Sequence, residues 1–129
     1  MTFAGFLAVG GGAAAGAWLR WWIGMLLNPV FPTVPLGTLT ANLVGGLLIG
    51  FALPVLSHYQ AMAPEVRLLV TTGFLGGLTT FSTFSAETAT LLLRADFGWT
   101  AALVAAHLFG SVLMTLAGIA LMRVALGQP

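Results

Sequence analysis

The sequence predicts an all-α membrane protein with four transmembrane helices, and three observations support this fold class. First, 59% of the 129 residues are hydrophobic and only 5% are charged, whereas soluble domains carry roughly 25% charged residues. Second, four basic and three acidic side chains are too few to cover a soluble body of this size. Third, four apolar stretches of about 20 residues, the length that spans a bilayer, nearly fill the chain. We therefore expect a single four-helix transmembrane domain over residues 1–129.

The same composition excludes several classes of protein. Four membrane helices leave no room for a soluble catalytic domain, and a net charge of +1 does not favour nucleic acid as a partner. The chain has no cysteine, which excludes disulfides and thiolate metal sites. The alanines at 13–15 look like a signal-peptide cleavage region. No Lys or Arg precedes the first apolar stretch, however, so we interpret that stretch as a retained helix.

Loop residues set the limits of each predicted span. The predicted spans are residues 3–27, 35–56, 66–93 and 99–126. The first loop contains Pro29, Pro32 and Pro35, and proline disfavours helix for the residue before it. Residues 57–64 and 94–96 form the other two loops. The tryptophans lie near span ends, as interfacial aromatics do: Trp18, Trp21, Trp22 and Trp99.

The arginines give almost no orientation bias. Arg67 and Arg123 lie near the side that holds both termini, and Arg20 and Arg94 lie near the other side. Because positive charge usually marks the cytoplasmic side, an even division predicts dual topology, with an antiparallel pair as the functional unit. The alternative is that another signal fixes the orientation. Glycines at GxxxG spacing further predict a tightly packed bundle or dimer: Gly12/Gly16, Gly46/Gly50 and Gly73/Gly77.

The third span is unusual because glycines and hydroxyl residues interrupt its apolar sequence. Residues 71–85 contain Gly73, Gly76 and Gly77 with a run of threonines and serines, and both glycine and threonine weaken a helix. We predict a helix broken in mid-membrane, as at many ion and substrate sites. Its free carbonyls would bind a cation if two copies met at Gly76 and Gly77. The alternative is a kinked packing helix whose hydroxyls bond to its own carbonyls.

Aromatic and polar side chains next to the predicted break are candidate pore residues. Phe81 and Phe84 share a helix face, where their positive ring edges would attract an anion weakly; core packing is the alternative. His107, Ser111 and Thr115 form one polar stripe on the fourth span. The stripe could pass an ion along its hydroxyl groups, or form interhelical hydrogen bonds.

Three further polar residues lie within the spans. Asn42 offers an amide donor to anions, or joins helices by hydrogen bonds. Arg20 either extends to the lipid headgroups or lines an entrance vestibule, and Glu87 follows the polar run of the third span. His58 lies in a loop and forms no convincing metal or haem pair with His107. Hydrogen-bond donors predominate among these side chains and no ring of acidic residues is present, so the lining favours a small anion. No combination of nucleophile, acid and base in the sequence points to an enzyme.

The chain resembles the Fluc-type fluoride channels, the CrcB family of bacterial fluoride exporters, over essentially its whole length. Three segments carry the resemblance: GAWLR at 16–20, GTLTANLVG at 37–45 and GFLGGLTTFSTF at 73–84. The third is highly specific to the family. The family often has tyrosine or another aromatic after the arginine, so Trp21 is a mild departure.

The resemblance implies a passive channel that exports cytoplasmic fluoride through two pores in an antiparallel homodimer. Such channels are multi-pass proteins of the bacterial plasma (inner) membrane. It also implies a structural sodium ion, Na+, held at the dimer centre by the backbone carbonyls of Gly76 and Thr79. Arg20 would lie by the aqueous entrance, and Glu87 would affect conductance, as would His107 if the polar stripe lines the path. The expected pore lining is Asn42, Phe81, Ser82, Thr83, Phe84, Ser111 and Thr115.

Three rival interpretations fit the sequence less well. A small multidrug transporter needs a carboxylate in the first helix, which has none. A haem or quinone anchor needs two histidines at matching depth. A cation channel built on the same broken helix predicts acidic residues at its mouth, and Glu87 is the only such residue near the polar run.

Overall fold

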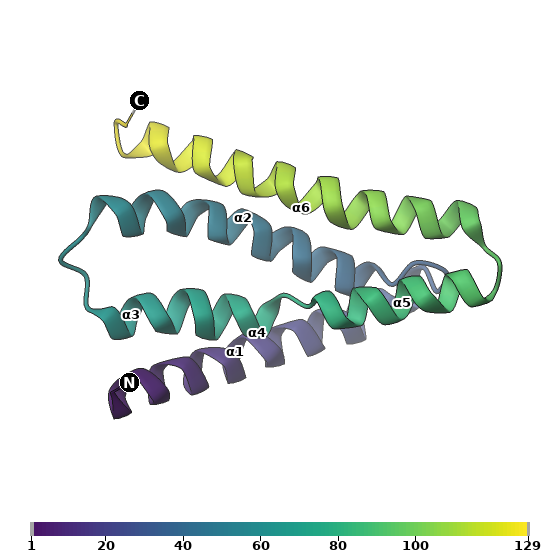
Figure 1. Cartoon of the computed structure of the whole chain (residues 1–129), viewed down its shortest axis with the longest axis horizontal. Helices are drawn as coiled ribbons and strands as arrows, with labels where there is room; N and C mark the ends of the chain where they lie inside the picture. Colours follow the sequence, from purple (N-terminus) through teal and green to yellow (C-terminus); the bar gives the residue numbers. More distant parts are fainter. Residues whose placement is uncertain (1, 129) are drawn as a thin grey trace.

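The computed structural model describes residues 2–128, and all the regular secondary structure in that range is helical (Figure 1). The all-helical prediction is therefore confirmed, and every predicted span end lies within two residues of an observed helix end. The elements in chain order are α1 (Phe3–Leu27), the 3-10 helix η1 (Asn28–Val30), α2 (Leu36–His58), α3 (Pro64–Leu68), the π-helix η2 (Leu69–Leu75), α4 (Gly76–Leu78), α5 (Phe81–Leu93) and α6 (Phe97–Ala125).

Local side-chain bonds explain why the helices begin and end where they do. The Thr2 hydroxyl accepts from the Gly5 N–H at 3.0 Å and caps α1, and Asp96 caps α6 in the same way. Between α1 and α2, the Asn28 side chain accepts from the Gly37 N–H at 2.8 Å. Asn28 and Asp96 both lie in predicted loops, and Thr2 directly precedes the first predicted span.

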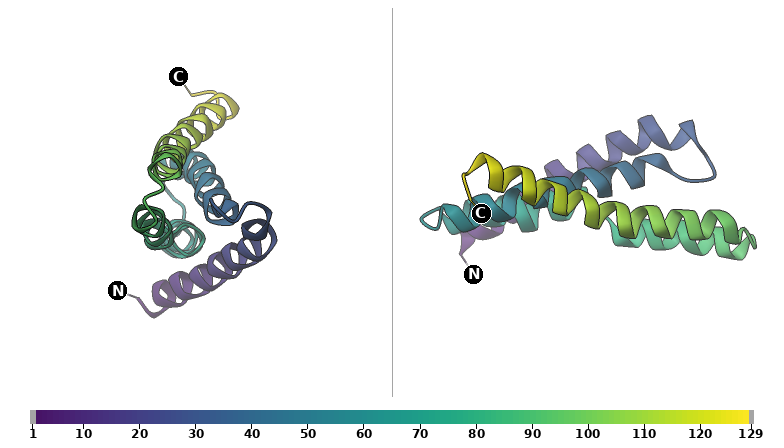
Figure 2. Two further views of the ribbon diagram at one scale, coloured as in Figure 1. Left: turned by 90° about the vertical axis from the view of Figure 1, so that its right-hand side faces the viewer. Right: turned by 90° about the horizontal axis from the view of Figure 1, so that it is seen from above.

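The helices form an elongated bundle in which two pairs pack closely. α2 packs mainly against α6, and α1 packs mainly against η2 and α4. Figure 2 shows α1 and α6 on opposite sides of the bundle. Both termini and the α2–α3 loop lie at one end, and the other two loops lie at the opposite end, as four spans require (Figure 1).

Glycine provides the close approach in both pairs. A Cβ added at Gly12 would lie 3.0 Å from the Cα of Gly73, and one added at Gly50 would lie 3.0 Å from the Cα of Gly118. No L side chain fits at such separations, so both helix pairs pack backbone to backbone. The other members of the three GxxxG pairs also face backbone atoms of a neighbouring helix: Gly16, Gly46 and Gly77. The glycine pairs therefore build the bundle within one chain, which was one of the two predicted uses.

Within residues 2–128, α2 and α6 are long and apolar enough to cross a membrane. α1 has 25 residues, among which Arg20 is the one charged residue. The third predicted span is divided among α3, η2, α4 and α5, of which the longest has 13 residues. Many large apolar side chains on the outer surfaces are exposed, including Phe6, Leu113 and Val124. Such a surface suits lipid rather than water.

Candidate functional site

Two extended residues separate α4 from α5. Thr79 has ψ 154°, and Thr80 has φ −151° and ψ 114°. The break lies within residues 71–85, where it was expected, but Gly76 and Gly77 themselves are helical and belong to α4. At Gly77 packing overcomes the weak helix propensity, since a Cβ there would lie 3.0 Å from the Cα of Ala13 in α1.

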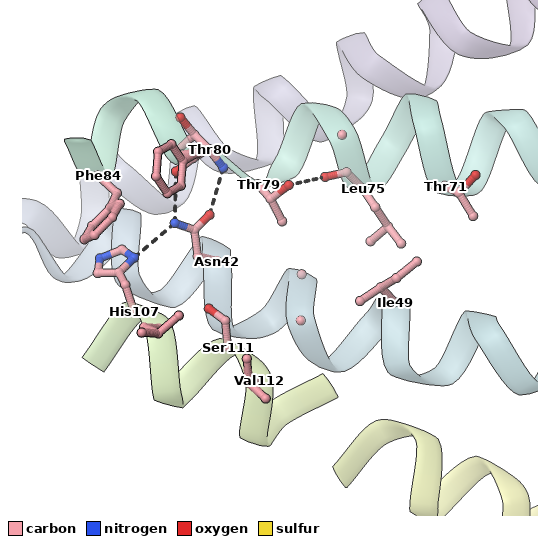
Figure 3. A pocket seen from close by; sticks show the side chains of 15 residues that line it. Asn42, Ile49, Thr71, Leu75, Thr79, Thr80, Phe84, His107, Ser111 and Val112 are labelled. Atoms are coloured by element: carbon pink, nitrogen blue, oxygen red, sulfur yellow. Dashed lines mark hydrogen bonds between the residues drawn. The ribbon is translucent and has the colours of Figure 1, made fainter. Parts of the chain in front are cut away.

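Asn42 holds the extended residues in place. Its Oδ1 accepts from the Thr80 N–H at 2.8 Å, and its Nδ2 donates to the Thr80 carbonyl at 3.0 Å. The side-chain amide thus pairs with one peptide unit on both sides, as a neighbouring strand would. Nδ2 also lies 3.1 Å from Nδ1 of His107. Of the two interpretations of Asn42, the structure supports interhelical bonding, because its amide protons are directed at protein acceptors (Figure 3).

The break gives the two helix ends opposite electrostatic character. In a continuous helix the Thr80 N–H would bond to the Gly76 carbonyl, but here it bonds to Asn42. The carbonyls of residues 76–79 therefore lose their usual helical partners, and only Gly77 gains a side-chain donor, Arg20 Nε at 3.0 Å. On the other side of the break, the first N–H groups of α5 lack helical carbonyl partners. Carbonyls at a helix C-terminus favour cations, and N–H groups at an N-terminus favour anions.

The π-helix η2 was not predicted. Single π turns are frequent at functional sites, but no local sequence pattern specifies them. Gly73 within η2 lies against α1, where an added Cβ would be 2.9 Å from the Val9 carbonyl oxygen. The hydroxyls of Thr71 and Thr79 each bond back to a carbonyl one turn earlier, both at 2.8 Å. These two hydroxyls follow the expected alternative in which threonines bond to their own helix.

Three rings follow one another beside Asn42. Phe81 and Phe84 meet edge to face with centroids 5.4 Å apart, and Phe84 lies 4.6 Å from the ring of His107 at an interplanar angle of 31°. Phe84 also packs on the buried cluster that contains Leu91 and Leu103. Phe81, in contrast, is 78% exposed. Core packing therefore accounts for Phe84 and does not account for Phe81.

A groove of about 520 Å³ runs beside the break, between α2, the α3–α5 segment and α6 (Figure 3). Its wall is polar at the break and apolar along α2 and α6, through side chains such as Ile49 and Val112. Seven of the predicted site residues line it: Asn42, Gly76, Thr79, Phe81, Phe84, His107 and Ser111. Residues from three separate predicted spans are therefore brought to one place.

Three other predicted pore residues do not line the groove. The Thr115 hydroxyl donates to the Ser111 carbonyl at 2.9 Å, which is a bond within α6. Ser82 and Thr83 both lie near the Thr80 hydroxyl, at 3.3 and 3.0 Å. In this arrangement their hydroxyl groups support the start of α5. Their predicted contact with an ion remains a prediction.

Arg20 and Glu87 also lie outside the groove, and each has an intramolecular partner. Arg20 is bound to the α4 carbonyl described above. The Thr38 hydroxyl donates to Oε1 of Glu87, while Oε2 is buried without a hydrogen-bond partner. The sequence analysis missed Thr38 as a partner, although it precedes Asn42 by four residues and so lies on the same face of α2.

Comparisons of the whole sequence with known proteins agree on one family. Residues 7–119 match the model of the family described as CrcB-like protein, Camphor Resistance (CrcB). A protein named fluoride-specific ion channel FluC from Nitrosospira multiformis is 63% identical over 112 residues, covering 87% of this chain and 88% of the relative. Proteins of the same name from Aromatoleum aromaticum and Pseudomonas paraeruginosa are 60% identical over 115 residues and 54% identical over 122 residues. These alignments cover 89% and 95% of this chain, and 88% and 96% of the relatives.

Proposed function

Because this chain belongs to the CrcB-like protein family, we propose that it is a passive, fluoride-selective ion channel that exports fluoride from the cytoplasm. Members of this family are channels in membranes, and the chain is a membrane protein and not an enzyme. The observation that carries the proposal is the identity of 63% to a protein named as a fluoride-specific channel, over nearly the full length of both chains.

The groove supports an anion path. Its polar groups include ring edges, the Ser111 hydroxyl and the N-terminal end of α5, and it contains no carboxylate. Fluoride is small and strongly hydrated, so a pore must replace its water by donors while still releasing it. Ring edges and hydroxyls do this without a fixed full charge, which would hold the ion too tightly. We propose that Phe81 and Phe84 with Asn42, Ser111 and Thr115 form this lining, together with Ser82 and Thr83.

We propose that a second, antiparallel copy completes the pore. The groove is open on one side, and Phe81 exposes 78% of its surface there although it is the residue nearest the break on α5. A pore needs a closed wall, so the wall would come from the partner. By symmetry each copy would contribute one groove, which gives two pores per dimer.

We further propose that a sodium ion lies where the two breaks meet. The carbonyls of Gly76 and Thr79 are among those that lose their helical partners, and they lie at the negative end of α4. Alkali cations are commonly bound by backbone carbonyls alone. The donor set therefore fits Na+, which would supply the positive charge that joins two carbonyl ends.

The channel would span the bacterial plasma (inner) membrane with four segments, the third broken in mid-membrane. Export would need no energy source other than the membrane potential, because a negative interior drives an anion outward by ~2.3 kcal/mol per 100 mV. Hydrogen fluoride that enters from acidic surroundings dissociates inside and is trapped as fluoride. A passive channel is sufficient to release it.

The test is ion efflux from liposomes that contain the purified protein, with fluoride and chloride compared side by side. Rapid voltage-driven release of fluoride with retention of chloride is the expected result. Release of both ions would refute fluoride selectivity, and no release from a folded protein would refute the channel proposal altogether.

A further inference from the structure

Arg20 lies deeper in the bundle than a residue at a membrane surface. It is the only charged residue of α1 and lies seven residues before the end of that helix, about 10 Å along the axis. Its Nε donates to the carbonyl of Gly77 at 3.0 Å, and Gly77 lies near the middle of the α3–α5 segment. A charged group at such depth is costly in lipid unless protein groups bind it. The structure therefore does not support the interpretation in which Arg20 extends to the lipid headgroups.

α1 packs along one side of α4 and carries Arg20 over its end. A Cβ added at Gly16 would lie 2.7 Å from the Leu78 nitrogen, and one added at Gly77 would lie 3.0 Å from the Cα of Ala13. Arg20 follows Gly16 by four residues, so both lie on the same face of α1. Figure 1 shows α1 running alongside α4. The Arg20 side chain therefore extends from a helix that is already fixed against α4.

The proposed sodium ligands lie on another side of α4. Gly76 and Thr79 both line the groove, and a Cβ added at Gly76 would meet only the Thr71 carbonyl oxygen, at 3.9 Å. Gly77 lies between these two ligands in sequence, but it faces α1. Because each residue has only two soft backbone dihedrals, a bond that fixes the Gly77 carbonyl also restricts the neighbouring peptide groups.

We propose that Arg20 is a positioning residue for the central cation site, and that it acts through the Nε–H bond to Gly77 rather than through its charge. The inference rests on the proposed function, specifically on its sodium site. Binding at the Gly76 and Thr79 carbonyls is stronger when the end of α4 is already ordered, because ordering mobile ligands reduces affinity. The positive charge of the guanidinium repels a second cation nearby, so the bond and the charge have opposite effects on sodium binding.

Two substitutions separate the hydrogen bond from the charge. Glutamine has its Nε2 at the same place along the side chain as arginine Nε, so Arg20→Gln keeps a donor for Gly77 and removes the charge. Arg20→Met has a stem of similar length with neither donor nor charge. The assay is thermal unfolding of the purified protein in detergent over a series of NaCl concentrations, with N-methylglucamine chloride keeping the ionic strength constant. Sodium that binds the folded protein raises the unfolding temperature, and the midpoint of this rise measures the site.

We expect Arg20→Met to need about tenfold more sodium to reach the midpoint, which is the effect of one lost hydrogen bond to a part-buried carbonyl. Arg20→Gln should need no more sodium than the unsubstituted protein. Arg67 is the matched control, because its Nε also donates to a backbone carbonyl, that of Met62 at 3.4 Å, but beside the α2–α3 loop. The same two changes at Arg67 should leave the midpoint unchanged.

An unchanged midpoint in Arg20→Met, or equal increases in both Arg20 variants, would overturn the proposal. If neither variant folds, nitrogen NMR of the unsubstituted protein decides. An Arg20 Nε–H resonance that moves when sodium replaces N-methylglucamine supports the positioning role, and an unmoved resonance contradicts it. Absence of any sodium effect on the unsubstituted protein would refute the sodium site and the role of Arg20 together, whatever the fluoride flux. Sodium stabilisation without fluoride efflux from liposomes would refute the channel and leave the role of Arg20 intact.

Discussion

Replacing Asn42 by aspartate tests whether the side-chain amide holds the break together. The two residues have the same shape, and aspartate keeps the acceptor for the Thr80 N–H at 2.8 Å. It loses the donor to the Thr80 carbonyl at 3.0 Å and the donor to His107 at 3.1 Å. It also places a carboxylate oxygen against a carbonyl oxygen, and a negative charge beside the proposed anion path.

The expected size follows from the bonds that are lost. Each of the two acceptors left without a donor costs ~1–3 kcal/mol, so Asn42→Asp should destabilise the protein by ~2–6 kcal/mol. Fluoride flux should fall further than the loss of folded protein explains, because the charge repels the ion. The assays are unfolding in detergent, followed by the loss of helical signal, and fluoride efflux per folded protein in liposomes.

Asn28→Asp is the matched control for this experiment. Asn28 uses only its side-chain oxygen, which accepts from the Gly37 N–H at 2.8 Å, and it lies outside the groove. The same chemical change there should alter neither stability nor flux appreciably. Unchanged stability in Asn42→Asp would refute the clamp at Thr80, and unchanged throughput would show that Asn42 does not lie beside the ion path.

Three further predictions follow from the glycine contacts and the proposed pore. Phe81→Ile should greatly reduce fluoride flux without dissociating the dimer, because ring edges are lost while volume is partly kept; normal flux would exclude the ring-edge role. Sodium removal during purification should loosen the dimer on size-exclusion chromatography if the carbonyls of Gly76 and Thr79 bind Na+, and an unaffected dimer argues against that site. Gly12→Ala should lower the unfolding temperature, since its Cβ would lie 2.8 Å from the Phe74 nitrogen, whereas Gly11→Ala meets nothing within 4 Å and should not.

The helix limits were accessible from sequence because they depend on local composition. An apolar stretch predicts a span, and prolines and capping residues predict where it ends, without knowledge of the fold. The pairing of the glycine faces required more. GxxxG spacing shows that a backbone approaches closely, but not whether the partner is another helix of the same chain. Here Gly12 meets Gly73 and Gly50 meets Gly118, so the chain itself provides both partners.

The sequence predicted a break within residues 71–85 but not the exact residues, because local propensity does not determine them. Gly76 and Gly77 are among the weakest helix formers in the segment, yet both remain helical, and Gly77 packs against α1. The helix ends instead where Asn42, 38 residues earlier in the chain, bonds to both sides of the Thr80 peptide. A partner so distant in sequence leaves no periodic pattern. The Thr38–Glu87 bond was missed for the same reason.

The break also explains how one short segment can serve a cation and an anion. Ending α4 frees carbonyl groups, and starting α5 frees N–H groups, so the two charges are favoured at neighbouring but separate places. A bare break would be costly in lipid, because its peptide groups would lack partners. Asn42 offsets that cost at Thr80, and Arg20 offsets it at Gly77. The carbonyl and N–H groups that remain free at the break are then available to ligands.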